Sequence, residues 1–306
     1  MDEVETKYGI LNGAHLIGKY STGESEYYSV DEISKLKVLG YNLVPLYGYK
    51  DARRKELPAI RFYKNGNIRN ISLNDSTKIL TKIGDFGVEK IVFYEDGMIN
   101  RLFLLDGKLS GFWSEDDEYN LAEIQYFNLP IGKFEARVIS LHLYRSGDVK
   151  SITFWPKERI SLKIGDQKIN VRIGISLYED GSLESCEPAK ATLINTPIGK
   201  IEAFDRNVLG IHGESNSLKF YKNGEIKEIV TFTNLIEVST HSGEKHRYSP
   251  KRVKKYSGDI DCFETVHVEF LENKIIINKE YEYEYSKNTF IIMPYGEKTL
   301  TLSGNL

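Results

Sequence analysis

The pentapeptide FYKNG occupies Phe62–Gly66 and returns letter for letter at Phe220–Gly224. Variants of it lie between the two copies: FYEDG at Phe93–Gly97, LYRSG at Leu143–Gly147 and LYEDG at Leu177–Gly181. Each copy has tyrosine three residues before its glycine, and apolar residues recur six residues before and five after that glycine. Asn-Gly and Asp-Gly pairs between alternating apolar residues are a strong hairpin signal. Each of these five phrases therefore predicts one β-hairpin.

The type of turn fixes the expected register of each hairpin. In the first copy, Asn65 and Gly66 both tolerate positive φ, which predicts a two-residue type I′ loop. Because strand side chains alternate between faces, this loop predicts three cross-strand pairs. The expected pairs are Ile60 with Ile71, Phe62 with Arg69, and Tyr63 with Ile68.

A second phrase, of the form TKIGDF, separates the hairpins and predicts their return turns. Its glycines are Gly84, Gly132, Gly165 and Gly199. The basic unit is then about 31 to 34 residues long, and two units carry insertions, at 104–127 and 202–217. A regular spacing of this kind predicts a repeat architecture.

The sequence thus predicts an all-β fold, an antiparallel β-hairpin repeat array in the form of a curled meander. A closed β-barrel or an irregular propeller is the alternative. The 20 Tyr and 14 Phe residues suit half-buried strand surfaces. One short N-terminal helix is expected over Ser29–Gly40, since Ser29 and Glu32 form a capping box and Ile33, Leu36 and Leu39 follow at helical spacing. We divide the chain into an N-terminal extension (1–56), a hairpin region (57–240) and a β-rich C-terminal cap or small domain (241–306).

The stretch FYEDGMINRLFLLDGKLSGFW, Phe93 to Trp113, resembles the degenerate MORN-type repeats (membrane occupation and recognition nexus) of many bacterial proteins. The resemblance covers roughly residues 57–230. It implies an antiparallel hairpin array that serves as a scaffold or binding module. Most units lack the Gly-x-Trp element of that family, so no binding residue is carried over from it.

Composition and charge narrow the class of protein. The formal net charge is −3, which gives no global attraction to nucleic acid, although a weak basic patch runs from Lys245 to Lys255. The N-terminus lacks the pattern of a secretory signal, and no apolar run is long enough to insert in a membrane. Two cysteines predict a reducing, cytoplasmic location. No metal-ligand spacing or cofactor motif occurs, so we expect neither.

The first insertion contains four consecutive acids, Glu115, Asp116, Asp117 and Glu118, between Trp113 and Tyr119. Carboxylates beside aromatic rings suit general acid–base catalysis or binding of a cation or sugar. Ser114 followed by Asp117 equally predicts a helix N-cap with acids in the first turn, and we prefer that interpretation.

The second insertion brings together Asp205, His212 and Glu214. A histidine near a carboxylate is the material of a general base. A polar surface loop has the same composition, and this is the favoured interpretation. If both insertions lie at one edge of the array, they share a cleft.

The tyrosines of the five phrases form the most regular column in the chain. They are Tyr63, Tyr94, Tyr144, Tyr178 and Tyr221. On an open face the rings would bind sugars, peptides or another protein, whereas on a closed face they belong to the core.

Two functions follow from these patterns. The first is a non-catalytic cytoplasmic binding or scaffold protein that uses the surface of the array, with a protein or small-molecule partner that the sequence does not identify. The alternative is an enzyme of unknown reaction, whose site is formed by the carboxylates and histidine of the two insertions.

Overall fold

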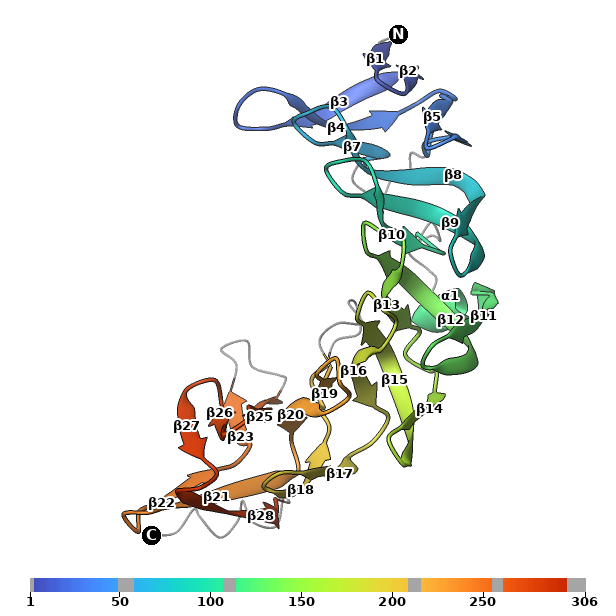
Figure 1. Cartoon of the computed structure of the whole chain (residues 1–306). Helices are drawn as coiled ribbons and strands as arrows, with labels where there is room; N and C mark the ends of the chain where they lie inside the picture. Colours follow the sequence, from blue (N-terminus) through green and yellow to red (C-terminus); the bar gives the residue numbers. More distant parts are fainter. Residues whose placement is uncertain (1–2, 49–57, 107–113, 209–215, 255–260, 296–306) are drawn as a thin grey trace. The chain divides into compact units, whose positions relative to one another are not determined.

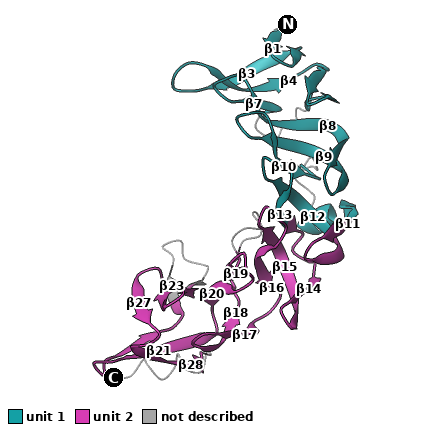
Figure 2. Cartoon of the chain, viewed as in Figure 1, with its two compact units in different colours: residues 1–125, 137–152 teal, residues 126–136, 153–306 magenta. Residues whose placement is uncertain are grey.

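The computed structural model describes residues 3–48, 58–106, 114–208, 216–254 and 261–295, and side chains are not described at 252–254 and 261–263. Its strands and single helix follow one another along the chain as antiparallel hairpins (Figure 1). The chain forms two compact units (Figure 2). Unit 1 comprises residues 1–125 and 137–152, and unit 2 comprises residues 126–136 and 153–306.

Unit 1 contains ten short or medium strands and the helix. They are β1 (Val4–Thr6), β2 (Gly9–Leu11), β3 (Ala14–Lys19), β4 (Ser25–Val30), β5 (Leu36–Val38), β6 (Tyr41–Leu43), β7 (Ile60–Phe62), β8 (Ile68–Thr81), β9 (Gly84–Phe93), β10 (Ile99–Phe103) and α1 (Glu115–Leu121). Three strands contribute to both units: β11 (Ile124–Leu129), β12 (Gly132–Leu143) and β13 (Val149–Phe154).

The strands of unit 2 follow the same alternation. They are β14 (Ile160–Ile164), β15 (Gln167–Leu177), β16 (Leu183–Pro188), β17 (Thr192–Thr196), β18 (Gly199–Ala203), β19 (Leu218–Phe220), β20 (Ile226–Thr231), β21 (Asn234–Thr240), β22 (Lys245–Tyr248), β23 (Lys251–Lys254), β24 (Asp261–Glu264), β25 (Val266–Phe270), β26 (Lys274–Ile277), β27 (Tyr281–Glu284) and β28 (Asn288–Pro294).

The main sheet of each unit is an antiparallel meander and does not close into a barrel. In unit 1 the strands pair in the order β3-β4-β7-β8-β9-β10-β12. In unit 2 the order is β14-β15-β16-β19-β20-β25-β26-β27. The all-β hairpin meander predicted from the sequence is therefore confirmed, and the closed-barrel alternative is wrong.

One row of buried apolar residues crosses each sheet. In unit 1, Ile60 pairs with Ile71 as predicted, Ile71 with Ile91, Ile91 with Leu102, and Leu102 with Leu141. All five are at most 1% exposed. In unit 2 the row runs through Ile175, Cys186, Leu218, Ile229 and Val268. The apolar positions six residues before and five after each phrase glycine thus build the core.

The turn type predicted for the phrases is wrong. In the first copy, Gly66 N–H donates to Tyr63 O and Tyr63 N–H donates to Asn67 O, which closes a loop of three residues rather than two. Only the glycine has positive φ, at 79°, so the turn is type I followed by a bulge residue. The longer loop pairs Phe62 with Ile68, not with Arg69. Ile68 accordingly lies in the core, and Tyr63 does not pair with it.

A sixth turn of this kind precedes the five phrases. Gly23 N–H donates to Tyr20 O, and Tyr20 N–H donates to Glu24 O. The sequence YSTG at residues 20–23 has the tyrosine and the glycine of the phrases, but Lys19 stands directly before the tyrosine, where every phrase has Phe or Leu, and we therefore did not predict this turn. We call these six loops the tyrosine turns.

The predicted return turns are confirmed, whereas the predicted N-terminal helix is wrong. Gly84, Gly132, Gly165 and Gly199 all have positive φ between paired or consecutive strands. Over Ser29–Gly40 the chain instead ends β4 and forms β5. Leu36 and Val38 are buried with Lys37 exposed between them, so the apolar period is two. Ile33 and Leu39, which the helix would have buried, are more than half exposed.

Candidate functional site

The acids of the first insertion lie in helix α1, where they form the cap that the sequence predicts. The Ser114 side chain accepts from Asp117 N–H, and Ser114 N–H donates to Asp117 Oδ2 at 2.8 Å. This backbone hydrogen bond lowers the pKa of Asp117. Glu115, Asp116 and Glu118 share the first turn, where they complement the helix dipole. The arrangement is that of a structural N-cap.

Of the two aromatic residues that flank these acids, the structure describes Tyr119. The Arg137 guanidinium lies 4.9 Å from the centre of the Tyr119 ring, and Arg137 Nε donates to Ala122 O at the end of the helix. Tyr119 thus packs against the residue that holds the helix C-terminus. Trp113 lies outside the described residues.

The second insertion is attached to the fold by a buried carboxylate that we did not predict. Glu187 is fully buried, and its two oxygens accept from Ser217 N–H at 2.8 Å and Asp205 N–H at 3.3 Å. Arg172 lies 3.7 Å away. Burial raises the pKa of Glu187, and the hydrogen bonds act against this shift. The carboxylate therefore joins the two chain segments that flank residues 206–216.

The predicted catalytic residues of this insertion are only partly described. The Asp205 carboxylate accepts from Asn207 N–H at 2.8 Å in a local turn. His212 and Glu214 lie outside the described residues. Helix α1 belongs to unit 1 and Asp205 to unit 2, so a cleft shared by the two insertions stays a prediction.

The phrase tyrosines are neither an open platform nor full members of the core. Each is half-buried. The hydroxyls of four of them, and that of Tyr20, donate to a main-chain carbonyl of the following hairpin. The bonds are Tyr20 to Phe62 O at 2.9 Å, and Tyr63 to Phe93 O, Tyr94 to Leu143 O, Tyr178 to Phe220 O and Tyr221 to Phe270 O, each at 2.8 Å. We call this series the tyrosine ladder.

Burial and cations act on the rings of this ladder. Burial raises the pKa of Tyr63, Tyr178 and Tyr221, which keeps their hydroxyls protonated as donors. Arg145 lies 4.3 Å from the centre of the Tyr94 ring, and Lys150 lies 5.9 Å from that of Tyr144. The described contacts of the tyrosine column are thus largely internal to the fold.

The predicted basic patch is partly neutralised. Lys245 and Arg247 both bind the carboxylate of Glu237, at 2.9 and 2.7 Å, and the Glu237 side chain is 5% exposed. These two cations are therefore engaged in the sheet formed by β21, β22 and β28.

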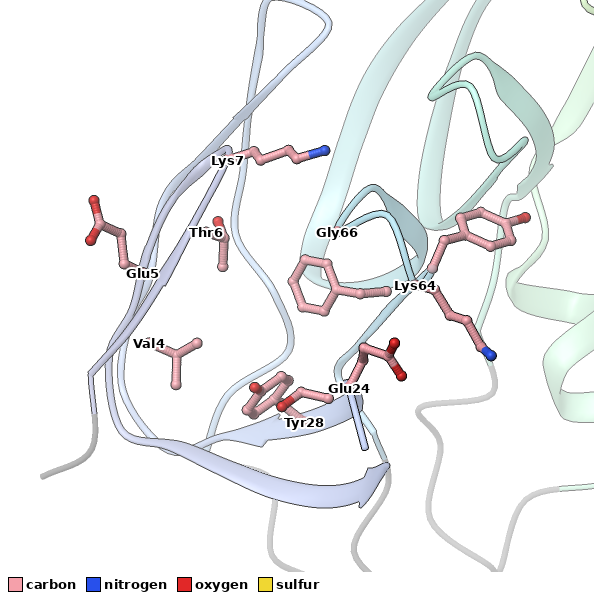
Figure 3. A pocket seen from close by; sticks show the side chains of 11 residues that line it. Val4, Glu5, Thr6, Lys7, Glu24, Tyr28, Lys64 and Gly66 are labelled. Atoms are coloured by element: carbon pink, nitrogen blue, oxygen red, sulfur yellow. The ribbon is translucent and has the colours of Figure 1, made fainter. Parts of the chain in front are cut away.

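A pocket of about 310 Å³ lies in unit 1, between the tyrosine turns Tyr20–Gly23 and Tyr63–Gly66. Its walls come from β1, from the start of β4 and from the second turn. In Figure 3, Val4 and Thr6 lie on one side of it, and Tyr28 and Glu24 lie across from them. Phe62 and Tyr28, whose rings meet edge to face at 6.1 Å, are both buried and line it. The pocket therefore has an aromatic wall that is already in place.

Charged groups of both signs lie around this unit 1 pocket. Lys7 Nζ donates to Asn65 O at 2.6 Å, which ties β1 to the second turn. Glu24 accepts from Thr22 Oγ1, and this hydrogen bond lowers the pKa of Glu24. Lys64 Nζ lies 5.4 Å from the centre of the Tyr20 ring. The tyrosine and glycine of Tyr20–Gly23 are the sequence signal that could have pointed to the pocket residues Glu24 and Tyr28, which follow this turn.

Within the described ranges, no group of three or more His, Cys, Asp or Glu side chains is placed to hold a metal ion. No helix among these residues combines the length and apolar character needed to span a bilayer. Cys186 takes an aliphatic position in the core and is unpaired, and burial raises the pKa of its thiol.

Comparison with known proteins found no matching family model, no matching curated protein and no matching solved structure.

Proposed function

We propose that this chain is a non-catalytic binding protein and that the unit 1 pocket is one of its binding sites. The observation that carries the proposal is a pocket built between two successive tyrosine turns, with the buried rings of Phe62 and Tyr28 in its wall. Concave sites with apolar walls and a few polar groups are typical ligand sites.

The tyrosine ladder supports this function because it makes the pocket rigid. Tyr20 donates to Phe62 O across the pocket's two turns, and Lys7 binds Asn65 O at its other side. A site that is held in shape before binding loses less conformational entropy when the ligand arrives. The resemblance to MORN-type hairpin proteins, which are read as scaffolds and binding modules, favours the same function and a repeat array as its framework.

The local hydrogen bonds of two acids that we considered for catalysis also favour a binding function. The Asp117 carboxylate is engaged by the helix cap and that of Asp205 by a local turn. Neither lines the unit 1 pocket, whose walls come from β1, β4 and the second of the two turns. Binding chemistry, rather than acid–base chemistry, is what the described pocket offers.

The experiment compares partners of the native protein with those of a variant whose pocket is filled. The tagged protein and its Ser25→Tyr variant are purified gently from the native host and weighed by native mass spectrometry. Ser25 lines the pocket and is half-buried, so a larger side chain fills the space. The control is Ser21→Tyr, at an exposed turn position that does not line the pocket.

We expect a stoichiometric companion, protein or small molecule, that is lost in Ser25→Tyr and kept in Ser21→Tyr. A companion kept by both variants would place binding elsewhere on the chain. The absence of any companion from the native protein would contradict the binding function itself.

A further inference from the structure

Unit 2 contains a second pocket at the equivalent place between two turns. It has a volume of about 1160 Å³ and lies between the tyrosine turn Tyr221–Gly224 and the next turn, Phe270–Lys274. In that next turn Leu271 stands where the other turns have tyrosine, so the described ladder ends there.

The two pockets share two residue types at equivalent positions of their turns. In each, the residue directly after the glycine of the first turn is glutamate, Glu24 or Glu225. In each, the aromatic residue that begins the next turn, Phe62 or Phe270, lines the wall and is buried. Among the six tyrosine turns, the other four have Asn67, Met98, Asp148 and Ser182 in place of the glutamate.

The two glutamates are also held in the same way. Oε2 of Glu24 accepts from Thr22, and Oε2 of Glu225 accepts from Asn223 Nδ2 at 2.7 Å. Thr22 and Asn223 both directly precede the glycine of their turn. Each carboxylate is thus fixed beside its pocket before any ligand binds, which favours a strong charge-assisted hydrogen bond.

At three of the four other steps of the series, polar side chains instead link one turn to the next. Asn67 Nδ2 donates to Glu95 O of the next turn at 2.8 Å. Arg145 binds Asp96 at 2.8 Å, and Lys222 binds Asp180 at 3.0 Å. At these steps polar side chains join successive turns, whereas at the two glutamate steps a pocket takes their place.

We propose that the chain is bivalent, with two equivalent pockets that each bind a peptide segment carrying an apolar side chain next to a lysine or arginine. The apolar side chain packs on Phe62 or Phe270, and the cation pairs with Glu24 or Glu225. The proposal rests on the binding function assigned to the unit 1 pocket. Its new elements are the second site and the chemistry of the ligand.

The charges around the two pockets indicate which of them binds a cationic peptide more tightly. In unit 2 a second carboxylate, Glu272, lines the pocket, and Lys222 is already paired with Asp180. In unit 1 the position that corresponds to Glu272 is Lys64, which repels a cationic ligand. The Thr22 hydrogen bond is the main cause that lowers the pKa of Glu24, and the charge of Lys64 makes a minor contribution in the same direction. The unit 2 pocket also presents the Tyr285 hydroxyl, which is buried without a hydrogen-bond partner in the described part of the chain. The unit 2 site therefore binds the peptide more tightly.

The test titrates the full chain with the blocked dipeptide acetyl-Phe-Arg-amide and follows binding by calorimetry and native mass spectrometry. We expect two bound molecules, with Glu225→Gln weakening the tighter site by about tenfold or more and Glu24→Gln weakening the other by a similar factor. The matched control is Glu179→Gln, in the exposed part of the turn Tyr178–Gly181, which leaves both sites unchanged. The charge-reversed dipeptide acetyl-Phe-Glu-amide should bind neither site.

Three results would overturn the inference: a single bound molecule, equal binding of the two dipeptides, or binding that survives the double variant of Glu24 and Glu225. Thermal melting of each variant verifies that it is folded, and both glutamates are exposed, so we expect unchanged melting curves. If Ser25→Tyr still removes a native companion while the Phe-Arg dipeptide does not bind, the binding function stands and only the ligand chemistry is refuted.

Discussion

The hydroxyl of Tyr63 donates to the main-chain carbonyl of Phe93 at 2.8 Å, and Phe93 directly precedes the tyrosine of the next phrase. Tyr94 repeats the relationship with Leu143, which precedes Tyr144. Each hydroxyl therefore satisfies a carbonyl at the end of a strand, where the sheet ladder gives way to a turn. The spacing that recurs in these phrases positions both the donor and the acceptor.

We predict that Tyr94→Phe lowers the free energy of unfolding by about 1–3 kcal/mol, because it leaves the Leu143 carbonyl without its donor while keeping the ring. Urea unfolding monitored by circular dichroism measures the change. Tyr126→Phe is the control, since the Tyr126 side chain is 76% exposed. An unchanged unfolding midpoint for Tyr94→Phe would show that water replaces the ladder bond at no cost.

The hairpins were predictable because their signal is local. Residues six before and five after the phrase glycine are apolar, and the structure pairs them across each hairpin, as Ile60 and Ile71 show. The register beside the turn was not predictable, since Asn-Gly suits both a two-residue loop and a three-residue loop with glycine last. Tertiary packing decides between them, and here it places Ile68 in the core.

The N-terminal helix failed for a related reason. Ile33, Leu36 and Leu39 fit a helical period, but Leu36 and Val38 fit a strand period equally well over so short a segment. A two-residue type I′ turn, which we had predicted for the phrases, occurs at Leu39 and Gly40. Both residues have positive φ, and they join Val38 to Tyr41.

The Ser114 cap was predicted correctly because its donor and acceptor are only three residues apart. The pockets were missed because each combines two turns that are distant in sequence.

We predict that Asp117→Ala destabilises helix α1 without affecting the unit 1 pocket. The Asp117 carboxylate accepts from Ser114 N–H and Oγ, so its removal exposes one end of a seven-residue helix. The measurement is hydrogen exchange of the helix amides, with Glu115→Ala as the control in the same turn. Loss of the companion bound at the unit 1 pocket in Asp117→Ala would contradict a purely structural role.

We predict that Glu187→Ala costs about 3 kcal/mol or more, since it leaves two buried amides, Ser217 N–H and Asp205 N–H, without an acceptor and removes the counter-charge of Arg172. Glu187→Gln should cost less, because the amide oxygen still accepts one of these bonds. Thermal unfolding of both variants gives the comparison, and Glu179→Ala, at an exposed site, is the control. Equal stability of Glu187→Ala and the native protein would show that the segment flanking residues 206–216 is held by other contacts.

We predict that the stability of the protein in acid depends on the Glu228 carboxyl. Burial alone would raise the pKa of this carboxyl, but hydrogen bonds from His267 at 3.3 Å and Lys219 at 2.7 Å outweigh burial and lower it to about 2. A folded-state pKa below the unfolded value contributes stability above the unfolded pKa, and that contribution is lost as the pH falls through the folded pKa. The window for Glu228 therefore runs from its ordinary value of 4.5 down to about 2.

Glu228→Gln should be less stable than the native protein at neutral pH, and the difference should shrink as the pH falls through this window. The free energy of unfolding at a series of pH values measures it, with Glu95→Gln, at an exposed turn position, as the control. A constant difference across the window would mean that the pKa of Glu228 is not lowered by folding. His267 and Lys219 would then do no more than offset the cost of burying the carboxylate.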